Sequence, residues 1–186
     1  MKKSLLFSGG VESTLLYYEL LKNASKNDSL NLFILDRDNK PIQKALSVYN
    51  LIKDSFNDTA STCNILEVPE GLNNTKRMMW AVNELSASSD EIYWGINAYF
   101  DHIKPDQQIF KNVDEKIKRY PQLRFPYLNY TKDKIIEQYI KYNIEWLLEH
   151  THSCGLPINQ PCGNCFNCRE RKYAYQLQGL DLHRGI

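Results

Sequence analysis

The sequence predicts an α/β fold in which a doubly wound, mainly parallel sheet carries helices on both faces. Two observations support this prediction: short apolar runs alternate with longer amphipathic segments, and a Ser-Gly-Gly turn follows the first run. A third observation, four cysteines between residues 154 and 168, predicts a metal-binding knuckle near the C-terminus. Because ligands of such sheets bind at the carboxyl ends of the strands, we expect a site at that edge.

Short apolar runs mark the expected strands, which are Ser4–Phe7, Asn31–Leu35, Asn64–Val68 and Glu91–Ile96. Apolar residues at helical spacing mark the expected helices, which are Thr14–Leu21, the segment after Pro41, Thr75–Leu85, Thr131–Tyr142 and Phe166–Leu177. Pro41 suits the first position of its helix, where a missing N–H costs nothing, and Thr131 is predicted to cap its helix.

Composition excludes several classes of protein. The 186 residues are 42% hydrophobic and 24% charged, which is ordinary for a globular domain with a substantial core. The formal net charge of +1 provides no overall attraction to nucleic acids or anionic membranes. MKKSLLFSGG lacks the apolar run of roughly 7–15 residues of a signal peptide, and no run of about 18 apolar residues would span a membrane. We therefore expect a soluble cytoplasmic protein without a membrane partner.

The stretch SLLFSGGVEST places an apolar strand before Ser8, Gly9 and Gly10 and a helix after them. Glycines permit backbone angles that present consecutive N–H groups to an anion, and a helix N-terminus adds partial positive charge. The spacing is neither that of a Walker A loop nor GxGxxG. The loop is either a phosphate cradle, with Ser8 and Ser13 as hydroxyl donors, or a plain turn capped by Ser8. Its place after the first strand of an α/β pattern favours phosphate binding.

The segment HSCGLPINQPCGNCFNCRER has the spacing C-x7-C-x2-C-x2-C, formed by Cys154, Cys162, Cys165 and Cys168. Four thiolates suit one tetrahedral zinc ion, and a closed set of four ligands is typical of a structural site. An iron–sulfur cluster is the rival interpretation, because four thiolates also hold such clusters. Two disulfides are disfavoured in a reducing cytoplasm. Cys63, beside an expected strand, is interpreted as an ordinary buried thiol.

Together the motifs resemble those of the 7-cyano-7-deazaguanine synthase family of PP-loop ATP pyrophosphatases. SGGVEST resembles the SGGxDS loop of that superfamily. WGINAYFDHIKPD resembles the family segment GVNAxDxSxYPD, with matches at Gly95, Asn97, Ala98, Pro105 and Asp106. FPYLNYTKDKIIEQYIKYNI is similar to TPLxxxxKxEIIxxGxxxG, with matches at Pro126, Lys132, Ile135 and Ile136. THSCG and PCGNCFNCRERKYAY resemble T-x-SCY and CGxCxxCxxRxxAF, down to Arg171, Ala174 and Tyr175.

The resemblance implies an ATP-dependent ligase of queuosine biosynthesis, with ATP, Mg²⁺ and a structural Zn²⁺ as cofactors. The carboxylate of 7-carboxy-7-deazaguanine is adenylated with release of pyrophosphate, and ammonia then gives the amide and AMP. A second ATP drives dehydration to 7-cyano-7-deazaguanine (preQ0). Members of the family often associate as dimers, so a homodimer is compatible with the resemblance.

The resemblance also assigns individual residues. The implied catalytic residues are Lys132, as a cation for developing negative charge, and Glu12. Judged from the residues alone, Lys132 would be a solvated lysine in the first turn of a helix. The implied nucleotide-binding residues are Ser8, Gly9, Gly10, Val11, Glu12, Ser13, Asp36 and Gly95. The implied zinc ligands are Cys154, Cys162, Cys165 and Cys168.

Several positions depart from the family pattern. Glu12 stands where the superfamily loop has Asp, so an extra methylene shifts a carboxylate beside the expected phosphates. LNNTKRMMW lacks the Arg-Asn pair of the family, for which Asn74 or Arg77 would have to compensate. The other departures are Phe100, His102, Gln107, Tyr127, Lys134 and Gly155. Many of them are expected around the substrate pocket, whereas the loop glycines and the cysteines persist.

We expect residues 1–150 to form the nucleotide-binding domain and residues 151–186 to form a zinc-binding segment packed on it. Three alternative functions stay open. The enzyme could stop at the amide, or hand the activated deazaguanine to an amine of a protein or nucleic acid. A tRNA thiolation enzyme would hold an iron–sulfur cluster on the cysteines. A binding module that has lost turnover would have Glu12 as its lesion.

Overall fold

The structure is a computed structural model that describes residues 1–36, 42–100, 113–154 and 161–180. Within these residues one sheet contains five strands, which are β1 (Lys2–Leu6), β2 (Ser29–Asp36), β3 (Ser61–Glu67), β4 (Glu91–Trp94) and β5 (Leu123–Arg124). Their order is β3-β2-β1-β4-β5, and every neighbouring pair is parallel. The chain moves outward from β1 to β3 and then returns to the other side of β1. The predicted doubly wound parallel sheet is confirmed.

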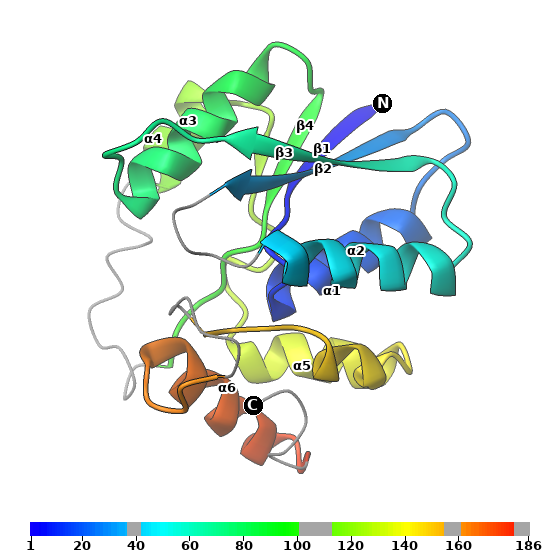
Figure 1. The fold of residues 1–186 in the computed structure, drawn as a ribbon, viewed down its shortest axis with the longest axis vertical. Coiled ribbons are helices and arrows are strands. Elements are labelled where there is room, and N and C mark those ends of the chain that lie inside the picture. Colours follow the sequence, from blue (N-terminus) through cyan, green and yellow to red (C-terminus); the bar gives the residue numbers. More distant parts are fainter. Residues whose placement is uncertain (37–41, 101–112, 155–160, 181–186) are drawn as a thin grey trace.

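Helices cover both faces of the sheet (Figure 1). On one face lie α1 (Val11–Lys22) and α2 (Ile42–Ser55), and on the other lie α3 (Asn74–Ser86) and α4 (Val113–Arg119). Beyond α1, a further layer contains α5 (Lys132–Lys141), the short 3-10 helix η2 (Glu145–Glu149) and α6 (Phe166–Leu177). Because α5 packs against α1 and α6 packs against α5, the C-terminal helix is joined to the first helix of the chain.

The central strand β1 is buried on both sides. Leu5 packs with α1 and α2, whereas Leu6 packs with α3, because successive side chains of a strand point to opposite faces. Strands buried in this way form continuous apolar runs in the sequence. The register pairs Leu6 with Phe33 of β2 and with Trp94 of β4, so β1 and β4 end level with each other while β2 extends three residues further, to Asp36.

Buried tyrosines join the helical layers through their hydroxyl groups. Tyr139 of α5 donates to the carbonyl oxygen of Val11, the first residue of α1, at 2.6 Å. Tyr17 of α1 donates to the carboxylate of Asp58 before β3 at 2.8 Å. Both rings are fully buried, so their hydroxyl groups require such partners. Helix α1 is therefore held at its first residue by α5 and near its middle by the segment before β3.

Arg171 anchors α6 to the rest of the molecule. It is 1% exposed, and its guanidinium donates to the carbonyl oxygens of Leu148 and of Thr151, the latter at 3.0 Å, and to the hydroxyl of Tyr175. Ala174 and Tyr175 belong to the same core cluster as the side chains of α1 and α5. The described part of the C-terminal segment thus packs on the common core, and the boundary near residue 150 stays a prediction.

Sequence reasoning missed some short elements. Among the described residues, α4, β5 and η2 were not predicted, because they are short and carry no extended apolar period. Thr131 occupies the N-cap position of α5, but its hydroxyl donates to Asp133 at 2.5 Å and caps no backbone N–H. The N-cap position is therefore as predicted, but the side chain makes no capping hydrogen bond because the nearby carboxylate captures the hydroxyl. Pro41 lies outside the described residues, and α2 begins at Ile42.

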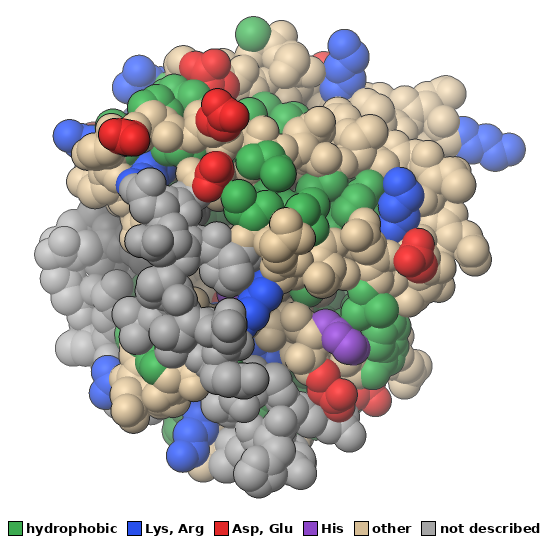
Figure 2. Space-filling view, in the orientation of Figure 1, with side chains coloured by type: hydrophobic (Ala, Val, Ile, Leu, Met, Phe, Trp, Pro, Cys, Tyr) green, Lys and Arg blue, Asp and Glu red, His purple; other side chains and the backbone are tan. Residues whose placement is uncertain are grey.

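Acidic and basic side chains are interspersed over the described part of the face in Figure 2, around a hydrophobic area. This pattern agrees with the formal net charge of +1. In the part of the chain that the structure describes, no helix is both long and apolar enough to cross a membrane.

Replacing Arg171 by Met would remove the guanidinium donor of the buried Thr151 carbonyl oxygen and of the buried Tyr175 hydroxyl, whereas the Leu148 carbonyl oxygen would keep the hydroxyl and the N–H of Thr151 as donors. We expect the free energy of unfolding to fall by about 3 kcal/mol, because each abandoned buried polar group costs about 1–3 kcal/mol. Urea denaturation followed by circular dichroism measures the change. Arg169→Met is the matched control, since Arg169 is exposed on the same helix, and it is expected to stay within about 0.5 kcal/mol of the wild type. Equal losses in both variants would contradict the anchoring role.

Candidate active site at the carboxyl end of the sheet

A cavity of about 890 Å³ lies at the carboxyl end of the sheet, within the size range of small-molecule and cofactor sites. It is lined by the ends of β1, β2 and β4, by the glycine loop, and by residues of α3, α4, α5 and α6. Apolar side chains on the α3 side include Leu6, Leu35, Met78 and Trp94. The cavity is therefore at the edge where the sheet topology predicts a ligand site.

The glycine loop has a conformation that suits glycine at its centre. Gly9 has a φ of +69°, and a Cβ there would lie 2.8 Å from Cα of Ala45 on α2. Hydroxyl groups close the loop: Ser13 Oγ accepts from the backbone N–H of Ser8 at 3.2 Å, and Ser8 Oγ accepts from that of Gly10 at 3.3 Å. The two serines therefore shape the loop and also line the cavity.

The N-terminus of α1 has no side-chain cap, so its backbone N–H groups can bind an anion. Gly10 is the N-cap residue, no side chain caps the helix, and Thr14 makes the first intrahelical backbone bond, to the Gly10 carbonyl at 3.0 Å. The preceding N–H groups of Val11, Glu12 and Ser13 have no acceptor within the helix. With the helix dipole they form the arrangement that binds phosphate groups. Ser8 does not cap the helix, because its hydroxyl bonds Gly10 and Ser13 instead, and phosphate binding by the loop stays a prediction.

Gly95, just after β4, lets the strand end approach the start of α1. A Cβ at this position would lie 3.1 Å from Cβ of Glu12 and 3.3 Å from the backbone nitrogen of Ser13. Gly95 also lines the cavity. The absence of a side chain at Gly95 therefore allows Glu12 and the loop to lie close to the end of β4.

Lys132, the first residue of α5, is 4% exposed and contacts two carboxylates. The carboxylate of Glu12 lies directly against its Nζ, and Oε2 of Glu170 lies 3.1 Å from Nζ. Burial lowers the pKa of Lys132, but the two carboxylates together raise it by more, so the pKa lies above its ordinary value. Lys132 is therefore a buried ammonium group, and the interpretation as a solvated lysine is wrong.

Glu170, which the sequence did not single out, comes from α6 and is fully buried. Its Oε1 accepts from Nδ2 of Asn97, after β4, at 3.0 Å. Burial raises the pKa of Glu170, and the charge of Lys132 opposes that shift. A signal was available, because Glu170 lies four residues before Ala174 and so shares the face of α6 that the apolar spacing predicts as buried.

Tyr99 lines the cavity near these charges. Burial, reinforced by the charge of Glu170, raises the pKa of Tyr99 to about 12. Its ring packs edge-on against Phe166 of α6, with ring centroids 4.6 Å apart. Tyr99 thus presents a neutral phenol beside the ammonium of Lys132.

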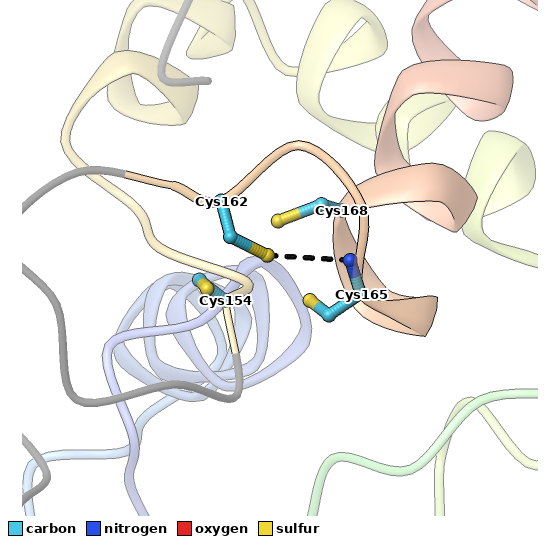
Figure 3. Close-up of side chains that lie close together, drawn as sticks. All are labelled: Cys154, Cys162, Cys165 and Cys168. Atoms are coloured by element: carbon cyan, nitrogen blue, oxygen red, sulfur yellow. Dashed lines mark hydrogen bonds between the residues drawn. The ribbon is translucent and has the colours of Figure 1, made fainter.

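The four predicted metal ligands converge beside the cavity (Figure 3). Their Sγ atoms all lie within 4.8 Å of one another, and none of these cysteines forms a disulfide. The backbone N–H of Cys165 donates to Sγ of Cys162 at 3.2 Å, and such backbone donors lower the pKa of the Cys162 thiol. Thiolates around one tetrahedral metal ion at about 2.3 Å lie about 3.8 Å apart. The cluster therefore fits a single metal ion, and the disulfide alternative is wrong.

The remaining predicted residues lie in different places. Asp36 is exposed at the end of β2 and is not among the described residues that line the cavity, so its nucleotide role stays a prediction. Asn74 lines the cavity and Arg77 does not. Cys63 packs against the main core cluster. The matched or departing positions outside the described residues are His102, Pro105, Asp106, Gln107 and Gly155. The cavity wall also contains Lys116 and Arg119 of α4, which sequence reasoning missed.

Known proteins share both the sequence pattern and the fold. A 7-cyano-7-deazaguanine synthase from Caldicellulosiruptor saccharolyticus is 24% identical, over 97% of this chain and 93% of that protein. NMN synthetase from Francisella tularensis has a TM-score of 0.56 at 15% identity, covering 96% of this chain and 77% of that one. The U34-tRNA thiolase NcsA from Methanococcus maripaludis, solved with its 4Fe–4S cluster, has a TM-score of 0.55 at 14% identity, covering 100% and 68%. At these identities the two structures establish the fold alone.

A family model described as queuosine biosynthesis protein QueC matches residues 86–179. The match contains Lys132, Glu170 and all four clustered cysteines. It also contains the three later segments on which the resemblance in the sequence rests, from WGINAYFDHIKPD onward. The chain therefore belongs to the queuosine biosynthesis protein QueC family.

Proposed function

We propose that this protein is an ATP-dependent 7-cyano-7-deazaguanine synthase, which converts 7-carboxy-7-deazaguanine and ammonia to the nitrile. The observation that carries the proposal is the ammonium of Lys132, held between Glu12 and Glu170 in the cavity that also contains the glycine loop. Membership of the family and the names of the relatives support the choice of substrate.

In the first step a carboxylate oxygen of the substrate attacks the α-phosphorus of ATP, and the bond to pyrophosphate breaks. The N–H groups of Val11, Glu12 and Ser13 suit the charge that develops on the departing pyrophosphate. Lys132 adds a fixed positive charge nearby. The carboxylate of Glu12 would hold Mg²⁺, which prefers oxygen ligands and neutralises phosphate charge.

In the second step ammonia attacks the acyl carbon, AMP leaves with one carboxylate oxygen, and the amide forms. A second ATP adenylates the amide oxygen, and loss of AMP with two protons from nitrogen leaves the nitrile. Each AMP thus removes one of the two carboxylate oxygens. Lys132 and the α1 terminus would serve both adenylations, because each releases pyrophosphate.

We propose Zn²⁺ as the resident ion of Cys154, Cys162, Cys165 and Cys168. Four thiolates complete a tetrahedral shell and leave no open position, which suits a structural role. The sulfur atoms, all within 4.8 Å of one another, favour one ion over a cluster, because a cluster places several iron and sulfide ions between its thiolates. The ion would hold the segment around Cys154 against the start of α6.

Purified protein with ATP, Mg²⁺, ammonium and 7-carboxy-7-deazaguanine is expected to form the nitrile with two AMP per product, measured by mass spectrometry. Lys132→Met is expected to lower kcat/KM by at least about 100-fold, because a preorganised charge that stabilises the transition state is lost. Lys134→Met is the matched control, since Lys134 is exposed on the same helix and its pair with Glu137 lies at the surface. Accumulation of amide, or a mass shift on an added amine acceptor, would favour the alternative end products. Absence of AMP under all conditions would exclude the synthase.

The purified protein is expected to be colourless and to contain about one zinc ion per chain by elemental analysis. Cys168→Ser is expected to lose the zinc, because Cys168 is one of four converging ligands. Cys63→Ser should retain it, since Cys63 is half-buried against the hydrophobic core and is not one of the four converging cysteines. A brown protein with visible absorption after anaerobic purification would instead support an iron–sulfur enzyme of tRNA thiolation.

A comparison of Gly9→Ala with Gly71→Ala separates the effect of backbone strain from the effect of a side chain that disturbs the glycine loop. Both glycines have positive φ, +69° and +75°, so each substitution costs stability of about 1 kcal/mol or more. Only a Cβ at Gly9 meets backbone, at Ala45, whereas a Cβ at Gly71 meets nothing within 4 Å. We expect Gly9→Ala to weaken binding of a non-hydrolysable ATP analogue at least about tenfold in calorimetry. Gly71→Ala should bind it normally, and equal affinities in the two variants would argue against the phosphate cradle.

A further inference from the structure

We propose that Glu170 is a positioning residue that shares Lys132 with Glu12. In this arrangement Glu170 keeps the ammonium in place when the Glu12 carboxylate turns toward Mg²⁺ and ATP. The inference rests on the proposed function, because it takes the magnesium complex of ATP as the substrate.

The two carboxylates around Lys132 differ in their freedom to move. The side chain of Glu170 is 1% exposed, and its Oε1 is held by Asn97 at 3.0 Å while Oε2 lies 3.1 Å from Nζ. The side chain of Glu12 is 14% exposed and lines the cavity at the mouth of the glycine loop. Glu12 can therefore exchange its partner, whereas Glu170 is fixed by burial and by the hydrogen bond from Asn97.

The balance of charge also favours an exchange. Two carboxylates face one ammonium, so the cluster of Glu12, Lys132 and Glu170 carries a surplus negative charge. Like charges in a partly desolvated site repel each other, which opposes keeping both carboxylates on the same lysine. A cation that arrives at the loop relieves this repulsion by taking Glu12.

The position of Glu170 connects the cysteine cluster to the lysine. Helix α6 begins directly after Cys165, and its first turn contains Cys168, two residues before Glu170. Arg171, the next residue, binds the carbonyl oxygens of Leu148 and Thr151. The segment that holds the metal ligands therefore also fixes the carboxylate that holds Lys132.

Glu170→Gln tests the proposal. A glutamine has one oxygen, so it cannot accept from both Asn97 and Lys132, and it carries no charge. Lys132 is then expected to pair with Glu12 alone and to retain it. The Mg²⁺ concentration that gives half-maximal ATP binding should rise about tenfold or more, because one hydrogen bond to a charged group typically changes an equilibrium constant by about that factor. ATP binding in the presence of a chelator should change less than about twofold.

The controls separate positioning from general damage. Glu137→Gln removes a carboxylate from an exposed pair on α5 and is expected to leave the Mg²⁺ dependence unchanged. Glu170→Asp keeps the charge but shortens the side chain, so a smaller shift in the same direction is expected, also if Glu170→Gln fails to fold. A Mg²⁺ dependence equal to that of the wild type in every folded Glu170 variant would overturn the proposal.

A second measurement, made without nucleotide, tests whether Glu12 and Glu170 share Lys132. In urea denaturation of Glu12→Gln, Glu170→Gln and the double variant, the losses should be non-additive by at least about threefold in the unfolding equilibrium constant. The double variant leaves the buried ammonium without any carboxylate, which costs more than the two single changes together. Additive losses would overturn the inference. A wild type that binds no ATP with Mg²⁺ would overturn the proposed function, while non-additive losses would still establish the sharing.

Discussion

The buried ammonium of Lys132 is the group on which the rest of the site depends. A lysine that is 4% exposed is stable as a cation only if carboxylates surround it, since an unpaired buried charge costs several kcal/mol. Its two partners come from α1 and α6, and the lysine itself begins α5. Folding must therefore bring three helices to one point. The hydroxyl of Tyr139 on the Val11 carbonyl and the guanidinium of Arg171 hold α1 and α6 in that place.

Close backbone packing gives the cavity its anion-binding end. Gly9 lies against Ala45 of α2 more closely than any side chain would allow, and Gly95 lies so near Glu12 and Ser13 that a side chain there would displace them. The open N–H groups of α1 then face the cavity from a fixed position. NMN synthetase and a tRNA thiolase share the fold at 15% and 14% identity, so the fold by itself does not decide the reaction.

The cysteine cluster belongs to the site as much as to the scaffold. Cys154 lines the cavity, and Cys168 lies one half-turn before Glu170 on the same helix. The thiolase NcsA was solved with an iron–sulfur cluster, whereas the sulfur atoms here, within 4.8 Å of one another, fit a single ion.

The sequence by itself determined the features that depend on neighbours along the chain. The alternation of apolar runs predicted the parallel sheet, the Ser-Gly-Gly turn predicted the loop, and the spacing of the cysteines predicted their convergence, because each involves short stretches. Tertiary structure decided the partners of Lys132. Glu170 and Asn97 are distant from it in sequence, and no local pattern states which charge meets which. The hydroxyl of Thr131 turned to Asp133 for a similar reason, because competing acceptors are settled only once side chains are packed. The two carboxylates that folding brings to Lys132 keep this buried helix lysine charged and fix its position.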